Sequence, residues 1–294
     1  MEKNMSNPII SIIIVNYNTA HMIVPCLESI TADQTVPVET IVVDNASTDD
    51  SVSLIKQNFS WVTLIESDQN LGFGKANNLA FQQAKGRYIY FLNPDTQIKP
   101  GIFQTMLDYM ENHKDIGLAG TRIIFPDGQE QDSVQSLYPR HRYAKKKFDA
   151  LKGEIAWVLG ASMIARHEII QKIGGFDERF FLYAEDIDLC LTIRQHGWKI
   201  GYIPDALITH WARQSEISSP PAAVWQRLLI ADRQFFEKHF SKLSYQIIKW
   251  SNIIQAIWRI FTLKITRPFV SNKQELDHKV DRYRVTCEIF QGTN

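Results

Sequence analysis

The stretch Glu39-Thr-Ile-Val-Val-Asp44-Asn45-Ala-Ser-Thr-Asp49-Asp50 decides the fold class of this chain. Residues 39–43 have the apolar, β-branched character of a buried strand, and the chain then breaks into a turn rich in Asp, Asn and Ser. In an open α/β sheet, ligands bind beyond the carboxyl ends of the strands. Asp44 is therefore expected where a ligand would be met.

The same pattern, an apolar strand followed directly by a short polar segment (here called its polar exit), occurs twice more. Ile9–Val15 leads into Asn16-Tyr17-Asn18-Thr19, and Tyr88–Leu92 leads into Asn93-Pro94-Asp95-Thr96. Pro94 cannot continue sheet pairing, so Asp95 is expected at a sheet edge. Three strands that each end in a carboxylate, an amide or an aromatic ring predict one site for a nucleotide and a metal ion.

The side chains at these strand ends suit a nucleoside diphosphate. Tyr17 has a ring that would stack on a pyrimidine, and Asp44 has an acceptor for the imide N–H of that base. A hard divalent cation bound to a diphosphate typically takes one or two protein carboxylates, and Asp95 could be one of them. The alternative is that Asp44 and Asn45 only form turns and cap the next helix, and that Asp95 lies in an ordinary turn.

Strands and helices alternate along residues 9 to about 125. This order predicts an α/β fold with a mostly parallel sheet and right-handed crossovers. The expected strands are Ile9–Val15, Glu39–Val43, Val62–Glu66 and Tyr88–Leu92. The expected helices are Met22–Ala32, Ser51–Asn58, Gly74–Ala84 and Ile102–Asn112.

The remainder of the chain is less regular. We expect residues 127–154, which carry a basic patch from Arg140 to Lys147, to form a mobile loop, and Ala156–Ala165 to form a strand. A helix from about Ala184 to His196 would be ended by Gly197. Pro220-Pro221 marks a boundary, and the chain beyond it looks helical to about Thr266. We therefore expect a domain of residues 1–219 and a helical C-terminal extension of residues 220–294.

Composition excludes several classes of protein. Lys plus Arg number 32 and Asp plus Glu number 32, so no overall charge favours nucleic acid. The three cysteines have no metal-ligand spacing and suit a reducing compartment. The first eight residues lack the apolar core of a signal peptide, and no apolar stretch approaches the ~20 residues of a membrane span. We expect a cytoplasmic protein.

The segment Asn70-Leu-Gly72-Phe-Gly74-Lys75-Ala-Asn77-Asn78 is a glycine-containing loop before an expected helix. Its backbone N–H groups and Lys75 suit a phosphate, because helix N-termini bind anions. The segment lacks G-x-G-x-x-G spacing and follows the third strand, which argues against a dinucleotide-binding fold. A capped turn is the alternative.

Three carboxylates, Glu185, Asp186 and Asp188, fall at the start of the helix expected from Ala184. One or two acids there need no functional reason, because the helix dipole favours negative charge at an N-terminus. Three acids directly after an aromatic run suggest a general base that deprotonates an acceptor hydroxyl in an inverting group transfer. His210, at the end of the strand-like segment 207–210, is either a further metal ligand or a structural histidine.

Seven ordered segments together resemble the family 2 glycosyltransferases of the GT-A fold, and within them the bacterial rhamnosyltransferase-like branch. The resemblance runs from about Ile10 to Ser215. The segments that carry it are 11–18, 41–49, 70–74 with Asn77 and Asn78, 91–95, Gly160-Ala161, 174–178 and 183–190.

The resemblance implies transfer of a sugar from a nucleotide-diphosphate donor, with inversion at the anomeric carbon and a Mg²⁺ or Mn²⁺ cofactor. Asp186 corresponds to the general base, with Glu185 as its nearest competitor, and Asp95 and His210 correspond to the metal site. Trp157, Gly160 and Tyr183 are expected on the acceptor side. The expected donor-binding residues are Asn16, Tyr17, Asp44, Asn45, Asn70, Gly74, Lys75, Asn78, Asn93 and Asp95.

Within this branch the favoured donor is dTDP-rhamnose, and a UDP-hexose or UDP-N-acetylhexosamine is the alternative. The acceptor would be a saccharide or a polyprenyl-diphosphate-linked saccharide in cell-surface polysaccharide synthesis. The chain departs from the family at two positions. Asn93 replaces one acid of the usual metal-binding pair, and Trp211-Ala-Arg213 replaces the glycines that commonly follow the histidine. Arg213 could itself offset diphosphate charge.

The segment from Lys242 to Arg267 has five basic residues and no acidic one. On a helical projection at ~100° per residue, eight apolar side chains share one face, with Lys242, Lys249, Lys264 and Arg267 beside it. Such a helix could lie on the anionic inner surface of the cell membrane, pair with a second copy of the chain, or pack into the core. The apolar residues are Leu243, Ile247, Trp250, Ile254, Ile257, Trp258, Phe261 and Ile265.

Two rival functions use the same general architecture. A sugar-phosphate nucleotidyltransferase would have a glycine-rich loop with a basic residue near the N-terminus, and Asn16-Tyr-Asn-Thr19 is no such loop. A non-catalytic sugar-binding partner would be expected to have lost at least one of Asp44, Asp95 and Asp186, and all three are present.

Overall fold

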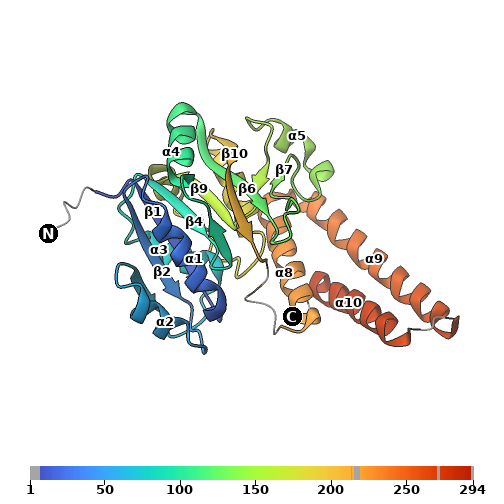
Figure 1. The fold of residues 1–294 in the computed structure, drawn as a ribbon. Coiled ribbons are helices and arrows are strands. Elements are labelled where there is room, and N and C mark those ends of the chain that lie inside the picture. Colours follow the sequence, from blue (N-terminus) through green and yellow to red (C-terminus); the bar gives the residue numbers. More distant parts are fainter. Residues whose placement is uncertain (1–6, 213, 215–218, 270–271, 293–294) are drawn as a thin grey trace. The chain divides into compact units, whose positions relative to one another are not determined.

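The structure is a computed structural model that describes residues 7–212, 214, 219–269 and 272–292 (Figure 1). The chain forms two compact units. The first comprises Met1–Tyr138, Ala150–Phe181 and Glu185–Ile217, and the second comprises Pro139–Asp149, Leu182–Ala184 and Ser218–Asn294.

The first unit is built on an eight-stranded sheet in the order β3-β2-β1-β4-β9-β6-β10-β5. β9 is antiparallel to both of its neighbours, β5 is antiparallel to β10, and the other pairs are parallel. The mostly parallel α/β sheet expected from the sequence is therefore confirmed. The strands are β1 (Ile10–Asn16), β2 (Val38–Asp44), β3 (Thr63–Glu66), β4 (Tyr88–Leu92), β5 (Thr96–Ile98), β6 (Ile116–Ile124), β9 (Ser162–Arg166) and β10 (Lys199–His210).

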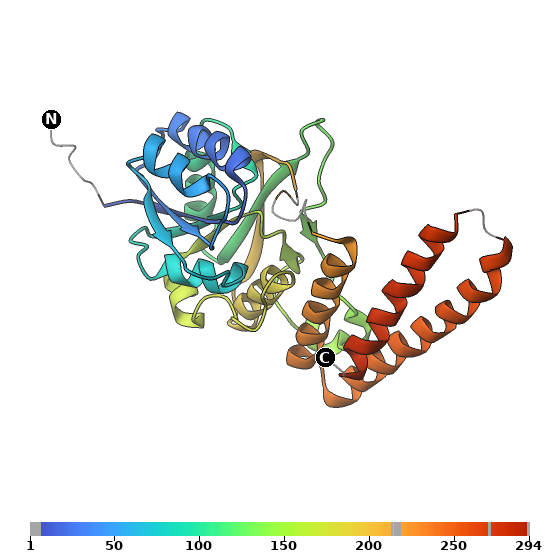
Figure 2. The same ribbon diagram turned by 90° about the horizontal axis from the view of Figure 1, so that it is seen from below.

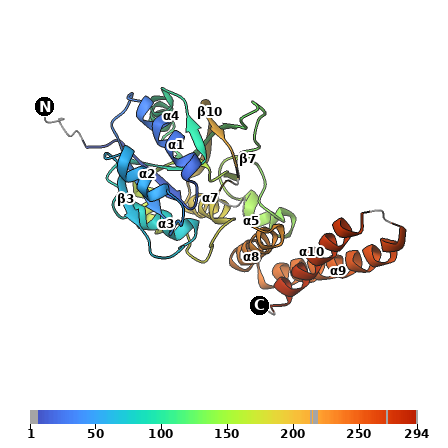
Figure 3. The same cartoon turned by 60° about the horizontal axis from the view of Figure 1, so that its bottom comes forward.

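Helices cover both faces of this sheet, as Figures 2 and 3 show. Because successive side chains of a strand point to opposite faces, Ile12 and Ile14 enter one buried cluster while Ile13 and Val15 enter the other. Burial on both faces explains the continuous apolar character of β1 and β2. The helices are α1 (Ala20–Ala32), α2 (Ser51–Asn58), α3 (Phe73–Phe81), α4 (Ile102–Asn112), α6 (His167–Ile173) and α7 (Glu185–Gln195).

The strands and helices expected between residues 9 and 112 are all present. The largest difference is at α3, which ends at Phe81 rather than Ala84, because residues 82–84 continue as tighter turns. β5, β6, α6 and most of β10 were not assigned from the sequence. β6 contains Gly117 and Gly120, which weaken a strand pattern, but a Cβ on Gly120 would lie 2.6 Å from Val158, so close packing requires the glycine.

The expectation of a mobile loop at residues 127–154 is wrong. This stretch contains β7 (Val134–Gln135), a 3₁₀ turn at His141–Tyr143 and α5 (Lys145–Asp149). Buried aromatic side chains order it. The Tyr138 hydroxyl donates to the Ala156 carbonyl at 2.8 Å, and Phe148 packs edge-on against Phe240.

The single strand expected at Ala156–Ala165 is also wrong. It divides into β8 (Trp157–Val158), which pairs with β7 in a separate two-stranded sheet, and β9. The Leu159 N–H still pairs with the Ser133 carbonyl next to β7, and the pairing ends at Gly160, whose N–H donates to the Asp186 side chain instead.

The second unit is helical. It contains α8 (Pro221–His239), α9 (Lys242–Thr266) and α10 (Lys273–Gln291), with α9 and α10 lying side by side as a hairpin (Figure 2). The helical extension expected beyond Pro220-Pro221 is confirmed, and helical structure continues past Thr266 to Gln291. Ser241 caps α9, and Asn272 caps α10. No helix in the described part of the chain is long and apolar enough to cross a membrane.

Candidate active site

Polar side chains from several strands gather at one edge of the main sheet. β1, β2 and β4 are parallel, so Asn16, Asp44 and Leu92 end at the same edge. β9 starts there, because Ser162 pairs with Leu92. β10 also ends there, because His210 pairs with Thr96. The carboxyl ends of the parallel strands are where ligands bind in open α/β sheets.

Asn16 and Asp44 are joined directly at this edge. The Nδ2 group of Asn16 donates to Oδ1 of Asp44 at 2.8 Å, and the Ser47 N–H donates to Oδ2 at 2.9 Å. Both side chains are buried. Two of the polar exits turn sharply, with Asn18 at φ 53° and Ala46 at φ 64°. Asp44 is therefore held at both oxygens, each of which keeps a lone pair for a ligand.

Asn45 ties the end of β2 to the glycine loop. Its Oδ1 accepts the Leu71 N–H at 2.8 Å, and its Nδ2 donates to Oδ1 of Asn70 at 2.9 Å. Gly72 has φ 78°, and a Cβ there would lie 2.4 Å from the Phe181 carbonyl oxygen. That carbonyl accepts the first N–H of α3, from Phe73. The loop is thus braced by the segment that leads towards α7.

Asn78 and Gly74 are engaged with the turn at 174–176. The amide of Asn78 donates to the Phe176 carbonyl and accepts the Phe176 N–H, both at 2.8 Å. A Cβ on Gly74 would lie 3.1 Å from Cβ of Phe176. Lys75 is exposed on α3. Donor binding by these residues stays a prediction.

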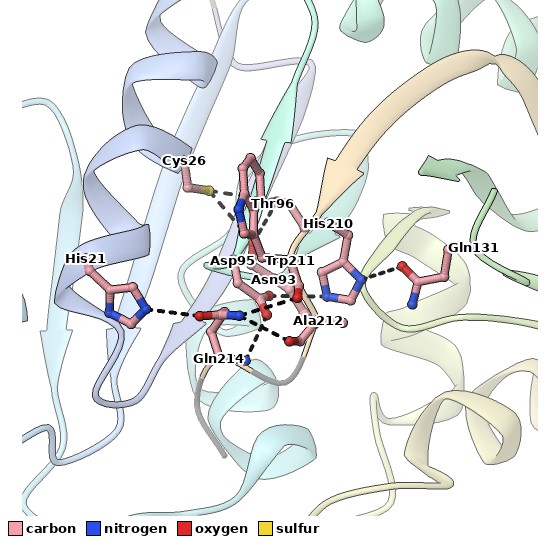
Figure 4. A network of polar contacts seen from close by, with 10 residues as sticks. All are labelled: His21, Cys26, Asn93, Asp95, Thr96, Gln131, His210, Trp211, Ala212 and Gln214. Atoms are coloured by element: carbon pink, nitrogen blue, oxygen red, sulfur yellow. Dashed lines mark hydrogen bonds and ion pairs between the residues drawn. The ribbon is translucent and has the colours of Figure 1, made fainter. Parts of the chain in front are cut away.

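His210 and Asp95 face each other inside the protein, with each side chain 7% exposed (Figure 4). Nε2 of His210 lies 3.3 Å from Oδ1 of Asp95, and Nδ1 lies 2.9 Å from Oε1 of Gln131. A neutral ring whose Nδ1 donates to the Gln131 oxygen presents the lone pair of Nε2 to the carboxylate. Nε2 has no hydrogen-bond partner among the described residues.

This arrangement fits a divalent cation. A carboxylate oxygen and an imidazole lone pair that face each other in a buried site are both acceptors, and a cation would satisfy both. Nearby, Oδ1 of Asn93 also lacks a hydrogen-bond partner within the described residues. No group of three or more His, Cys, Asp or Glu suited to a metal occurs in the described part of the chain. Further ligands would therefore come from the substrate, as at phosphate-bound Mg²⁺ sites.

Asp186 is fixed beside Gly160. Its Oδ2 accepts the Gly160 N–H at 2.9 Å, and its Oδ1 accepts the Ile187 N–H at 2.8 Å. A Cβ on Gly160 would lie 3.2 Å from Cβ of Asp186, so the glycine allows this close approach. The contact brings the start of α7 to the sheet edge at which β9 begins.

The two adjacent carboxyl groups at the start of α7 differ in environment. Glu185 is buried, and its Oε2 has no hydrogen-bond partner among the described residues. Burial, reinforced by the charges of Asp186 and Asp188, raises the pKa of Glu185 to about 8. Burial of the Asp186 carboxylate also raises its pKa, while the N–H groups of Gly160 and Ile187 favour its charged form. Both carboxyl groups thus have a raised pKa, and Asp186, whose two oxygens accept backbone N–H groups that favour the charged form, is the better candidate for the base.

The two other residues expected on the acceptor side have structural features of their own. The Trp157 indole N–H donates to the Leu137 carbonyl at 3.2 Å from β8. Tyr183 and Ala184 have φ values of 74° and 63° directly before α7. Consecutive non-glycine residues in this region are uncommon and recur at functional sites. Contact of Trp157 or Tyr183 with an acceptor stays a prediction.

Several residues at this edge were not identified from the sequence. Gln131 orients His210 across 79 positions of the chain, and the Gln214 N–H lies 3.3 Å from Oδ2 of Asp95 (Figure 4). Ser47 accepts the Asn18 N–H at 2.9 Å. No local pattern marks Gln131 or Gln214, because each acquires its role only when distant segments meet. Arg213, expected near the diphosphate, lies outside the described residues.

Comparison with known proteins identifies the group to which the chain belongs. The model of the family described as Glycosyl transferase family 2 matches residues 11–174, more than half of the sequence. This chain belongs to glycosyl transferase family 2. The matched segment contains the expected residues at the ends of β1, β2 and β4 and the glycine loop.

Two curated relatives of this family 2 enzyme are named as rhamnosyltransferases. The N-acetylglucosaminyl-diphospho-decaprenol L-rhamnosyltransferase of Mycobacterium tuberculosis is 26% identical over 72% of this chain and 79% of its own length. The rhamnosyltransferase WbbL of Escherichia coli is 30% identical over 70% of this chain and 85% of its own length.

Solved structures establish the fold of this family 2 enzyme as GT-A. The mannosyltransferase PcManGT from Pyrobaculum calidifontis, in complex with GDP-Man and Mn²⁺, aligns with a TM-score of 0.61 at 16% identity, covering 99% of this chain and 89% of its own. Residues 1–349 of TarS from S. aureus, in complex with UDP-GlcNAc, align with a TM-score of 0.58 at 17% identity, covering 97% of this chain and 92% of their own. Both alignments concern the fold alone.

Proposed function

We propose that this family 2 glycosyltransferase transfers L-rhamnose from dTDP-rhamnose, with inversion, onto a lipid-linked saccharide. The observation that carries this proposal is the meeting of three carboxyl groups at one sheet edge. Asp44 ends β2, Asp95 follows β4, and Asp186 is bonded to Gly160 just before β9. Transfer from a nucleotide sugar needs a group that binds the base, a group that holds a cation at the diphosphate, and a base for the acceptor hydroxyl, all at one site.

In the proposed reaction, Asp186 removes the proton from the attacking acceptor hydroxyl. The acceptor oxygen then bonds to the anomeric carbon as the bond to the diphosphate oxygen breaks, so that the configuration inverts. The Asp186 carboxylate is suited to this role because its raised pKa brings it nearer to neutral pH, where a general base is most effective. Glu185, which is buried and lacks a hydrogen-bond partner for Oε2 among the described residues, would support the site without accepting the proton.

Asp95 and His210 are the residues that would hold a Mg²⁺ or Mn²⁺ ion. The ion, when bound, would offset the charge of the leaving diphosphate. Asn16 and Asp44 would bind the base, with Tyr17 stacking on its face. The imidazole ligand favours Mn²⁺ over Mg²⁺, because Mg²⁺ prefers oxygen ligands. The Mn²⁺ complex of the mannosyltransferase PcManGT is consistent with this choice.

The names of the relatives support the donor and the acceptor in this proposal. Both the mycobacterial and the E. coli relatives are named for rhamnosyl transfer, and the mycobacterial one is named for a decaprenol-linked acceptor. The alternative donor is a UDP-hexose or UDP-N-acetylhexosamine, because TarS was solved with UDP-GlcNAc. We place the reaction at the cytoplasmic face of the membrane, where a soluble donor and a lipid-linked acceptor can meet.

The test measures nucleoside diphosphate release from dTDP-rhamnose, UDP-glucose and UDP-N-acetylglucosamine, with a polyprenyl-diphosphate-linked N-acetylglucosamine acceptor. Acceptor-dependent release of dTDP alone supports the proposal. Acceptor-dependent release of UDP from a UDP-sugar instead would show that the donor is that UDP-sugar and not dTDP-rhamnose. Pyrophosphate-dependent formation of dTTP would indicate a nucleotidyltransferase, and donor binding without any release would indicate a non-catalytic sugar-binding protein.

A further inference from the structure

The eight apolar side chains that share one face of α9 are all exposed. Their exposed fractions run from 47% at Ile247 to 72% at Leu243, and the face includes Trp250 and Trp258. Other parts of the α9 surface are covered, because Ile248, Ile253 and Ala256 are buried. An apolar face of this size and continuity is unusual on a protein surface and marks an interaction site.

Charge is segregated between the two helices of the hairpin. α9 and the following Arg267 carry five basic residues and no acidic one, whereas α10 carries four of each sign. Arg267 is paired with Asp277 of α10 at 3.0 Å, and Arg259 lies over the ring of Tyr283. Lys242, Lys249 and Lys264 flank the apolar face on the helical projection at ~100° per residue. Solubility of the hairpin would not require that α9 carry basic residues and no acidic ones.

A second basic segment belongs to the same unit and packs beside α9. Residues 139–149 contain five basic residues and one acidic residue. The Ser244 hydroxyl donates to the Tyr143 carbonyl at 2.8 Å, and Arg140 donates to Asn252 at 2.7 Å. α5 accordingly lies near the start of α9 (Figure 3).

On the projection of α9, Ser244 lies across the apolar face from the lysine flank, whereas Asn252 lies on the side opposite Leu243. Relative to Leu243, Lys242 and Lys264 fall at about −100° and −60°, whereas Ser244 and Asn252 fall at about +100° and 180°. The Ser244 contact therefore brings this second basic segment to the flank of the apolar face away from the lysines, near the start of α9. Arg142, Lys145 and Lys146 are exposed on the second segment.

We propose that α9 and residues 140–147 together form a surface that binds an anionic lipid bilayer, with α9 lying in the interface. The exposed tryptophans suit the headgroup level, and the basic groups on both flanks suit acidic headgroups. α9 does not meet the requirements for a membrane span. A second copy of the chain is a poorer partner, because pairing through this face would bring the basic flanks of two copies together.

The test is co-sedimentation of the full chain with vesicles of phosphatidylcholine alone, or of equal parts phosphatidylcholine and phosphatidylglycerol, without donor or acceptor. Binding to the anionic vesicles is expected, and it should weaken as salt rises from ~0.05 to ~0.5 M. Each lysine near an anionic surface strengthens binding by about fivefold. The Lys242→Gln, Lys249→Gln, Lys264→Gln triple variant should therefore lose on the order of 100-fold.

Matched variants separate the parts of the surface. Arg142→Gln with Lys146→Gln should weaken binding by about 25-fold, whereas Lys273→Gln, Lys279→Gln and Arg284→Gln on α10 should change it little. Ile254→Gln with Trp258→Gln should abolish most binding, and Trp61→Gln, an exposed tryptophan of the first unit, should not. Circular dichroism confirms that each variant is folded.

Three results would overturn the inference. The first is equal binding to neutral and anionic vesicles. The second is binding that the Ile254 and Trp258 changes leave intact. The third is a protein that ignores vesicles and changes from dimer to monomer with those changes, in light scattering, which would make the face an interface between copies. Because no sugar is present in these assays, none of these outcomes bears on the proposed glycosyl transfer.

Discussion

Nε2 of His210 lies 3.3 Å from Oδ1 of Asp95, and Gln131 holds the other ring nitrogen at 2.9 Å. The proposed role of this buried pair is to bind a divalent cation, and substitution of Asp95 tests that role. Asp95→Asn should lower donor turnover by at least ~100-fold, because metal stabilisation of developing charge is worth several kcal/mol. Turnover measured with Mn²⁺, Mg²⁺ and chelator checks this, and Asp205→Asn, at an exposed carboxylate, serves as the control. Full activity in excess chelator would contradict the metal role.

Gln131 should act on the metal site only through His210. Gln131→Leu removes the acceptor for Nδ1 and leaves the ring free to turn. We expect ~10–100-fold weaker Mn²⁺ binding with little change in turnover at saturating Mn²⁺. Titration of activity with Mn²⁺ measures the shift. An unchanged titration midpoint would show that Gln131 does not position the ring.

Asp186→Asn should fold normally, bind the donor and lose ~10²–10⁴-fold in transfer, as removal of a general base does. Glu185→Gln should retain most turnover, because burial favours the neutral form of Glu185 and glutamine is a neutral side chain of similar shape. Isothermal titration with the donor and single-turnover transfer separate binding from chemistry. If the Glu185 variant is inactive and the Asp186 variant is nearly normal, the base is Glu185.

The raised pKa of Glu185 links stability to pH. A carboxyl group whose pKa is higher in the folded than in the unfolded state contributes most below its unfolded pKa, and this contribution is lost as pH rises towards the folded value. Unfolding free energy should therefore fall between the ordinary pKa near 4.5 and about 8. In the Glu185→Gln variant, the fall in unfolding free energy across this pH range should be smaller by at least ~1.4 kcal/mol, which corresponds to one pKa unit. Urea unfolding of both proteins across this range measures the difference, and parallel curves would contradict it.

Gly72→Ala should destabilise the protein more than Gly101→Ala. Both glycines have positive φ values, 78° and 91°, so alanine costs about 1–2 kcal/mol in backbone strain at either position. At Gly72 the added Cβ would also lie 2.4 Å from the Phe181 carbonyl oxygen, whereas at Gly101 nothing lies within 4 Å. Denaturant unfolding measures both losses. Equal losses would show that the loop before α3 is not braced by Phe181.

The sequence alone determined the elements whose information is local. Continuous apolar runs followed by Asp, Asn and aromatic residues defined β1, β2 and β4 together with their polar exits, because strand burial and turn chemistry depend on neighbouring residues. The apolar face of α9 was equally visible, since helical periodicity needs no partner to be recognised. The spacing of the segments indicated the family, which the comparison confirms.

The tertiary structure decided what depends on distant contacts. The stretch 127–154 looks like a polar loop, but Tyr138 and Phe148 are buried by residues from other segments, and this orders it. Gln131 and Gln214 have no local signature and join Asp95 and His210 only through the fold. The contrast between Glu185 and Asp186 also appears only in three dimensions. Burial and the N–H groups that surround each carboxylate decide its proton affinity, and neither can be read from two adjacent acids in a sequence.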